Sequence, residues 1–274
     1  MSGMVTNLDN KGLKYIAKEF DLFYIDIWGV IHNGITLFDG AVHCLDELEK
    51  MGKEYILLTN APRPNNTVIK FLQKMGLENK KCEKVFTSGE AALSYLNFNC
   101  KNLKFFHIGP KRDFDLFKYF KKNKVDRIED SELLLCTGLF ENREDDLVYY
   151  KKIFKDKTNI RMICTNPDLV VDRGNKKELC AGSVAKVFED EGGKVDYFGK
   201  PYPLVYNEAT KTENKKILCV GDNLNTDIKG ANNQNFNSLF ILDGIHKNEI
   251  DKNLENLLMR YNAKVDYIQS KLKW

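Results

Sequence analysis

The sequence predicts an α/β fold in which short parallel strands alternate with helices. Short apolar runs recur along the 274 residues, and between them lie longer stretches whose apolar residues have helical spacing. Short apolar β segments separated by helices are typical of parallel strands joined by right-handed crossovers. The alternation runs from end to end of the chain without a repeat period or a low-complexity linker.

The elements follow one another in order. The first strand, LFYIDI at 22–27, leads through a polar turn into the helical segment 40–52, where apolar residues recur every three positions from Val42 to Met51. The remaining strand segments are apolar runs that lead into glycine, proline or polar residues: 54–60, 85–88, 103–109, 132–138, 161–166, 195–201, 216–222 and 238–244. The remaining helical segments lie between and after them: 65–77, 90–96, 113–123, 145–154, 183–192, 203–211, 225–232 and 249–262.

The length bounds the domain organisation. A chain of 274 residues holds one large domain or two smaller ones. One layered sheet of nine strands is an alternative, but a core with an inserted α/β domain suits this length better.

The composition is that of an ordinary globular protein. Hydrophobic residues make up 43% and charged residues 30% of the chain, and the formal net charge is +3. The lysines are spread along the chain, and no basic stripe interleaved with aromatic residues indicates nucleic-acid binding. The seven cysteines are an odd number and form no C-x-x-C pair, so they indicate neither a zinc site nor a disulfide framework. With no apolar signal region and no run of about 18 apolar residues, we expect a cytoplasmic protein without membrane contact.

Polar residues end three of the expected strands. The first strand ends on Asp26, the second on Thr59 and Asn60, and KILCVGD ends on Asp222, with Asp227 five residues later. In open α/β sheets the ligand lies outside the carboxyl ends of the strands, at the point where the strand order reverses. If the three strands are neighbours, their terminal side chains form an oxygen-rich site that suits Mg²⁺ and phosphate.

Each of these residues alone has an ordinary structural explanation. Asp26 could form an Asx turn, Thr59 and Asn60 could cap a helix, and Asp222 with Asp227 could form a capping turn. Asp26 could also be the aspartate that holds magnesium in a P-loop nucleotidase. Such a protein needs a G-x-x-x-x-G-K-[ST] loop, which the chain lacks. What favours a functional site is the order of the motifs: an acid, then Thr-Asn, then Gly-Lys-Pro, then Gly-Asp followed by Thr-Asp.

That order resembles the haloacid dehalogenase (HAD) superfamily, and more narrowly its class IIA, NagD-like phosphatases, over nearly the whole chain. The four matching motifs are DIWGVIHNG from Asp26, LLTNAPRP, GKPYPLVYNEA and VGDNLNTDIKGA. TNPDLVV and CAGS, ahead of the third motif, match the family's domain junction. The resemblance implies a Rossmann-like, doubly wound parallel-sheet core at 1–85 and 183–274, with an inserted α/β C2-type cap at 86–182.

The resemblance also implies a metal site and a nucleophile. Asp26 would attack phosphorus to give an aspartyl-phosphate that water hydrolyses. Mg²⁺ would be held by Asp26, Asp222, Asp227 and the backbone carbonyl of Trp28. Gly29 fits a tight backbone turn that a Cβ would obstruct.

The phosphate-binding and substrate-binding residues are implied in the same way. Thr59 and the backbone N–H of Asn60 would hold phosphate oxygens, and Lys200 would neutralise the nucleophile and the transferring group. Two further groups could face the substrate, a small phosphorylated metabolite: Arg63 after the second motif, and Asn166 with Asp168 near the returning domain junction. NagD-like proteins often pair through their caps, which suggests a homodimer.

Trp28 departs from the family pattern. In the family's phosphatases this position holds a second Asp that donates a proton to the departing alkoxide, and indole has no proton to give at neutral pH. General-acid help is worth roughly 10²–10⁴ in rate. Three explanations compete: another group such as His32 supplies the proton, the substrate has a good leaving group, or hydrolysis has been lost. The last would make the protein a phosphate-binding or regulatory module instead of a Mg²⁺-dependent phosphatase.

Overall fold

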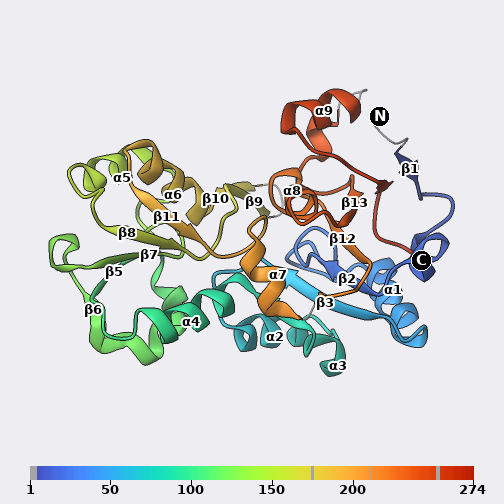
Figure 1. Cartoon of the computed structure of the whole chain (residues 1–274), viewed down its shortest axis with the longest axis horizontal. Helices are drawn as coiled ribbons and strands as arrows, with labels where there is room; N and C mark the ends of the chain where they lie inside the picture. Colours follow the sequence, from blue (N-terminus) through green and yellow to red (C-terminus); the bar gives the residue numbers. More distant parts are fainter. Residues whose placement is uncertain (1–4, 174–175, 211, 251–253) are drawn as a thin grey trace. The chain divides into compact units, whose positions relative to one another are not determined.

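A computed structural model describes residues 5–173, 176–210, 212–250 and 254–274 (Figure 1). The chain divides into two compact units, the first made of Met1–Thr59, Ile69–Phe86 and Lys200–Trp274, the second of Asn60–Val68 and Thr87–Gly199. The longer segment of the second unit, Thr87–Gly199, thus begins near the expected start of the cap at residue 86 and continues beyond residue 182, and the unit also includes Asn60–Val68. The cap boundaries stay a prediction.

The first unit is built on a seven-stranded sheet with the strand order β1-β14-β13-β12-β2-β3-β4. Its strands, in chain order, are β1 (Thr6–Asn7), β2 (Leu22–Ile25), β3 (Glu54–Thr59), β4 (Val85–Thr87), β12 (Ile217–Gly221), β13 (Asn237–Ile241) and β14 (Tyr267–Gln269). β2 pairs in parallel with β3 on one side and with β12 on the other. From β2 the chain builds β3 and β4 outward in one direction, whereas β12, β13 and β14 extend in the other. The strand order therefore reverses between β2 and β12, which confirms the predicted doubly wound core.

The first unit also has helices, several of which pack against this sheet. They are η1 (Leu13–Tyr15), η2 (Ala17–Glu19), α1 (Asp39–Lys50), α3 (Asn79–Cys82), α7 (Pro203–Ala209), the π-helical η5 (Leu224–Ile228), α8 (Lys229–Asn233), η6 (Lys247–Glu249) and α9 (Leu254–Tyr261), and α2 (Asn65–Lys74) contributes residues to both units. Val205 and Tyr206 of α7 and Ala231 of α8 form one apolar cluster with Tyr24 of β2 and Cys219 of β12. This packing fixes the two central strands that carry acids at their ends.

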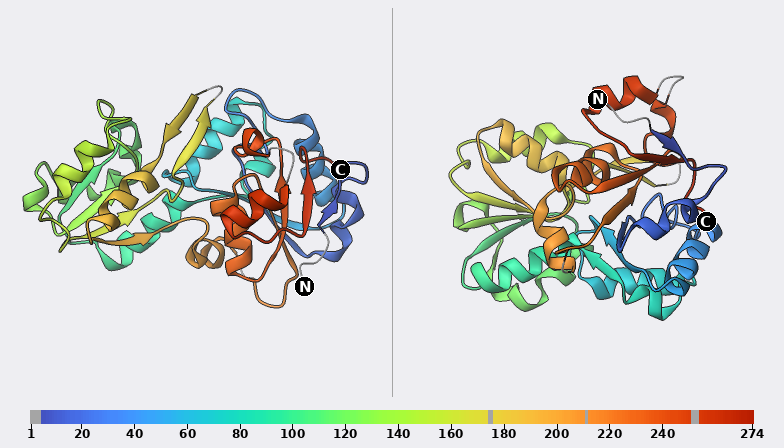
Figure 2. Two further views of the ribbon diagram at one scale, coloured as in Figure 1. Left: turned by 90° about the horizontal axis from the view of Figure 1, so that it is seen from above. Right: turned by 45° about the vertical axis from the view of Figure 1, so that its right-hand side comes forward.

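The second unit has a five-stranded parallel sheet of its own, in the order β11-β8-β7-β5-β6. Its strands are β5 (Phe105–Ile108), β6 (Lys124–Val125), β7 (Leu133–Cys136), β8 (Arg161–Cys164) and β11 (Lys194–Tyr197), and its helices are α4 (Ser88–Asn99), η3 (Lys111–Asn123), η4 (Ile128–Asp130), α5 (Leu147–Phe154) and α6 (Ala181–Asp190). Figure 2, left, shows a separate antiparallel pair in yellow, β9 (Val170–Arg173) and β10 (Lys176–Leu179). The division of the strands between a seven-stranded sheet, a five-stranded sheet and this pair excludes the alternative of a single nine-stranded sheet.

The expected elements appear with small differences. All nine expected strands are present, whereas the segment expected as a helix at 113–123 forms the 3₁₀ helix η3. Residue 211 and residues 251–253, which belong to two expected helical segments, lie outside the described residues. Among the described residues, no helix combines the length and the apolar character needed to cross a bilayer.

Candidate active site

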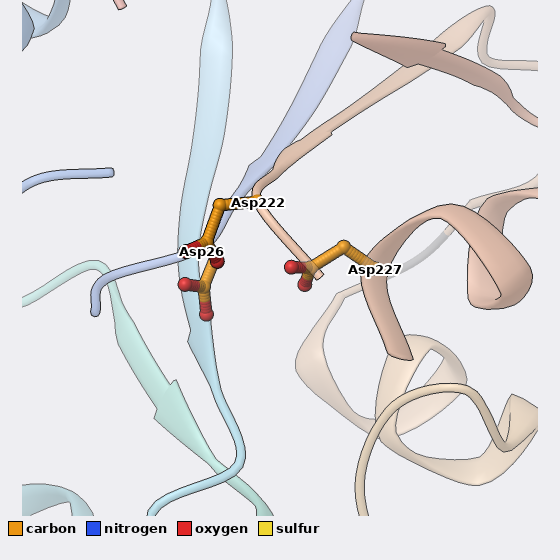
Figure 3. Close-up of side chains that lie close together, drawn as sticks. All are labelled: Asp26, Asp222 and Asp227. Carbon is orange, nitrogen blue, oxygen red and sulfur yellow. The ribbon is translucent and has the colours of Figure 1, made fainter. Parts of the chain in front are cut away.

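Three buried carboxylates gather at the carboxyl ends of β2 and β12 (Figure 3). Asp26 follows β2, Asp222 follows β12, and Asp227 lies in η5 and points toward the other two. The parallel register pairs Val220 with Ile25, so the two acids that follow these strands lie at the same edge of the sheet. One oxygen from each of the three carboxylates lies within 4.8 Å of the others.

Lys200 forms ion pairs with two of these carboxylates. Its Nζ lies 2.5 Å from Asp26 Oδ1 and 2.7 Å from Asp227 Oδ1, and it donates a hydrogen bond to the Leu58 carbonyl at 2.8 Å. Only 4% of Lys200 is exposed. Burial opposes its charge, but Asp227 and Asp26 outweigh burial and raise the pKa of Lys200 above its ordinary value. The ammonium is therefore charged and fixes Asp26 in place.

The negative charge of Asp222 is balanced less well than that of Asp26. It is buried, and its Oδ2 accepts a hydrogen bond from the Ile245 N–H at 2.8 Å. Burial first, and then repulsion from Asp26 and Asp227, raises the pKa of Asp222 well above its usual range. A divalent cation among the three carboxylates would remove this repulsion, and an all-oxygen donor set fits a hard ion such as Mg²⁺. The residues present therefore fit the metal that the sequence predicts.

Three glycines lie so close to the carboxylates that a side chain at any of them would overlap an aspartate. Gly29 has a φ of +83°, and a Cβ added there would lie 2.2 Å from Asp222 Oδ2. A Cβ at Gly244 would lie 2.1 Å from Asp222 Cβ, and one at Gly221 would lie 2.1 Å from Asp227 Cγ. Gly29 was predicted from the sequence, whereas Gly221 and Gly244 were not. The signal was present, because both lie next to an acid at the end of an apolar strand.

We expect Gly29→Ala to weaken metal binding. Its Cβ would displace Asp222, so the unfolding free energy should fall by roughly 1–3 kcal/mol from the overlap, beyond about 1 kcal/mol for the positive φ. Titration calorimetry with Mg²⁺ and thermal unfolding measure the two effects. Gly52→Ala is the matched control, because Gly52 has a φ of +66° with no heavy atom within 4 Å of an added Cβ. Equal magnesium affinity in both variants would contradict the close contact.

The residues predicted to bind phosphate and substrate are divided between the first and the second unit. Thr59 ends β3, next to β2, and is 8% exposed. Asn60 belongs to the second unit, where its Nδ2 donates to Asp168 Oδ1 at 3.1 Å, and the Asp168 N–H donates to Asn166 Oδ1 at 3.0 Å. The structure thus joins three of the predicted residues in one hydrogen-bonded chain.

Arg63 also lies in the second unit. Its Nε donates to Asp113 Oδ1 at 3.0 Å, and its second guanidinium nitrogen lies 2.9 Å from the same oxygen. Asp113, which follows Arg63 by 50 positions, was not predicted from the sequence as its partner. A substrate role for Arg63 stays a prediction.

Trp28, two residues after Asp26, contacts the turn that follows it. Its indole meets the His32 ring edge to face at 5.0 Å, and His32 meets the Phe71 ring at 5.5 Å. His32 is 2% exposed, and its Nδ1 accepts a hydrogen bond from the Gly34 N–H at 2.8 Å. The imidazole is therefore packed into the turn and used as an acceptor.

Comparison with known proteins identifies the family. Residues 23–121 match the model of the haloacid dehalogenase-like hydrolases, and residues 197–272 match a second HAD-hydrolase-like model, together more than half of the chain. The chain is a haloacid dehalogenase-like hydrolase. The HAD motif residues Asp26, Lys200 and Asp222 fall within the two matched segments.

Individual relatives place this HAD hydrolase in the NagD-like class IIA. Phosphoglycolate phosphatase 2 of Arabidopsis thaliana is 24% identical over 277 residues, covering 89% of this chain and 91% of the relative. The 4-nitrophenylphosphatase of Schizosaccharomyces pombe is 25% identical, covering 87% and 89%. The crystal structure of a HAD-like hydrolase from Brucella suis has a TM-score of 0.82 at 26% identity, covering 95% and 98%. A putative NagD protein has a TM-score of 0.67 at 25% identity, covering 86% and 93%.

In this HAD hydrolase His32 is neutral at pH 7. Burial lowers the pKa of His32 from 6.5 to about 4. A neutral imidazole is a weak acid, so the structure gives little support to His32 as the proton donor that replaces the missing Asp. That role stays a prediction.

The buried neutral state of His32 predicts a pH dependence of stability. The pKa is about 4 in the folded protein and 6.5 in the unfolded chain, so the unfolded chain binds more protons between these values. This contribution, roughly 3 kcal/mol, is complete above pH 6.5 and is lost as the pH falls toward 4. We expect His32→Asn to flatten the pH dependence of unfolding by denaturant, measured in EDTA. The control is His43→Asn at an exposed site in α1; an equal slope in both variants would contradict the assignment.

Proposed function

We propose that this HAD hydrolase is a Mg²⁺-dependent phosphatase that acts on a small phosphorylated metabolite through an aspartyl-phosphate on Asp26. The observation that supports it best is the buried cluster itself, in which Asp26 contacts Lys200 and lies within 4.8 Å of Asp222 and Asp227. The names of the relatives, among them phosphoglycolate phosphatase and acid sugar phosphatase, agree with this activity.

In the proposed reaction the chain's own residues orient the nucleophile and the phosphate. An oxygen of Asp26 forms a bond to phosphorus as the bond to the leaving oxygen breaks, and water then attacks phosphorus and regenerates the carboxylate. Lys200 holds Asp26 Oδ1 and offsets the negative charge that the incoming phosphate brings. The Thr59 hydroxyl and the Asn60 N–H would hold phosphate oxygens. Mg²⁺, held by the three aspartates and the Trp28 carbonyl, would supply Lewis-acid stabilisation of the phosphoryl oxygens.

The test measures phosphate release from phenyl phosphate, acetyl phosphate and a sugar phosphate, with Mg²⁺ and with EDTA. We expect the protein to release phosphate from at least one of these three compounds in Mg²⁺ and from none of them in EDTA. No release from any of them, with magnesium binding shown by calorimetry, would contradict the phosphatase and favour a non-catalytic binding module.

We also propose a cellular location and an oligomeric state for the protein. All seven cysteines are free and buried, which suits the reducing cytoplasm. Pairing of two copies through the second unit stays a prediction, and light scattering measures it.

A further inference from the structure

Three apolar side chains in and next to the turn that follows the nucleophile are at least partly exposed, and we call them the aromatic shelf: Trp28 and Ile35 of the turn, and Phe71 of α2. All three belong to the first unit, as does Asp26. Ile35 is 74% exposed and Phe71 is 40% exposed, and Trp28 is partly exposed. Exposed apolar side chains that lie together can mark a ligand-binding surface, and Trp28 lies only two residues after Asp26 in the chain.

The indole of Trp28 is fixed from two sides. His32 packs edge to face against it at 5.0 Å and in turn against Phe71 at 5.5 Å. Gly34 lies so close that an added Cβ would be 2.8 Å from the indole ring. The Gly34 N–H donates to His32 Nδ1, which holds the imidazole between the two other rings. The rings of Trp28, His32 and Phe71 therefore form a preformed stack, and Trp28 lies two residues after Asp26 in the chain.

The same residues offer little acid help to a leaving group. Indole is not an acid at neutral pH. His32 Nδ1 accepts the Gly34 N–H, so the ring proton of a neutral imidazole lies on Nε2, and a neutral imidazole is a weak acid. A leaving group that departs without a proton must be a stable anion. Phenols have a pKa of about 10, like the tyrosine side chain, whereas alcohols lie near the value of water, about 15.7.

From these two observations we infer that the aromatic shelf selects phosphate monoesters of phenols, whose ring packs on Trp28 and leaves as a phenolate. The inference rests on the proposed function. Asp26 forms the bond to phosphorus, the bond from phosphorus to the aryl oxygen breaks with its electron pair, and the phenolate takes its proton from bulk water. Water then cleaves the aspartyl-phosphate, so that the sum is aryl phosphate plus water giving phenol plus phosphate.

The first test measures binding without hydrolysis. Phenylphosphonate and methylphosphonate, which carry no cleavable P–O ester bond, are titrated into the Mg²⁺-loaded protein by calorimetry. We expect phenylphosphonate to bind more tightly, and Trp28→Leu and Phe71→Leu each to weaken it about threefold to tenfold, the range of one aromatic contact. Methylphosphonate affinity should stay unchanged in Phe71→Leu, which shows that the folded site remains. Phe98→Leu, at an aromatic residue of the second unit that is 86% exposed, is the control. Unchanged phenylphosphonate affinity in both shelf variants would overturn the inference.

The second test measures the leaving-group dependence of kcat/KM over substituted phenyl phosphates and glycerol phosphate. The wild type should lose rate steeply as the pKa of the leaving group rises. Trp28→Asp should raise glycerol phosphate turnover by roughly 10²–10⁴ and flatten this dependence, because it restores a proton donor. Wild-type turnover of glycerol phosphate equal to that of phenyl phosphate would overturn the inference. Absence of hydrolysis of every ester, with phenylphosphonate binding that still depends on Trp28, would refute the phosphatase and support the ligand class of the shelf.

Discussion

Asp26→Asn is expected to reduce phosphate release by at least roughly three orders of magnitude, the scale on which loss of a nucleophile acts. The amide has no anionic oxygen to bond to phosphorus, so the aspartyl-phosphate does not form. Rapid quench with a ³²P-labelled aryl phosphate should trap acid-stable label on the wild type and none on Asp26→Asn. Assay of product release over the same time gives the rate.

The same substitution should leave the fold intact. The amide oxygen that replaces the Asp26 carboxylate can still accept a hydrogen bond from Lys200, and one of three mutually repelling negative charges is removed. We therefore expect the unfolding free energy in EDTA to stay within about 1 kcal/mol of the wild type. Loss of activity together with a large loss of stability would mean that the carboxylate is needed for folding, and the activity result would then say nothing about a nucleophile.

The fold was predictable because the sequence shows it locally. Each apolar run that becomes a strand has its own boundary, and the parallel pairing of β2 with β12 brings the following residues, Asp26 and Asp222, to one edge. β9 and β10 were missed because they carry VVDR and KKEL, which are not apolar runs. β14 was missed because it has only three residues, two of them partly exposed.

The site was only partly predictable, because several contacts depend on distant segments. Lys200 follows Asp26 by 174 positions, and no local pattern joins the two, so it entered the prediction through the family resemblance alone. Gly244 approaches Asp222 only because β13 lies next to β12 in the sheet. Arg63 could be interpreted as a substrate-facing cation, since nothing near it in the chain indicates its ion pair with Asp113. Such pairings follow from the order of the strands, which apolar periodicity does not specify.

Lys200→Met is expected to cost about 3–5 kcal/mol of unfolding free energy in the metal-free protein, as for removal of one partner from a buried ion pair. The side chains of Lys200 and of its partners Asp26 and Asp227 are 5%, 10% and 4% exposed. Without the ammonium, two buried carboxylates next to Asp222 lose their counter-ion. Denaturant unfolding in EDTA measures the loss.

Magnesium distinguishes the two sources of positive charge in this site. If the cation binds among the same carboxylates, saturating Mg²⁺ should stabilise Lys200→Met more than it stabilises the wild type, since it also offsets the charge that Lys200 no longer balances. Lys50→Met is the control, because Lys50 lies 2.6 Å from Glu47 but its side chain is 69% exposed. An ion pair of similar length in water contributes little, so that variant should unfold almost as the wild type does. Were Lys200→Met as stable as the wild type in EDTA, the ion pairs of Lys200 would add no net stability to the fold, and their role would be to hold the catalytic geometry.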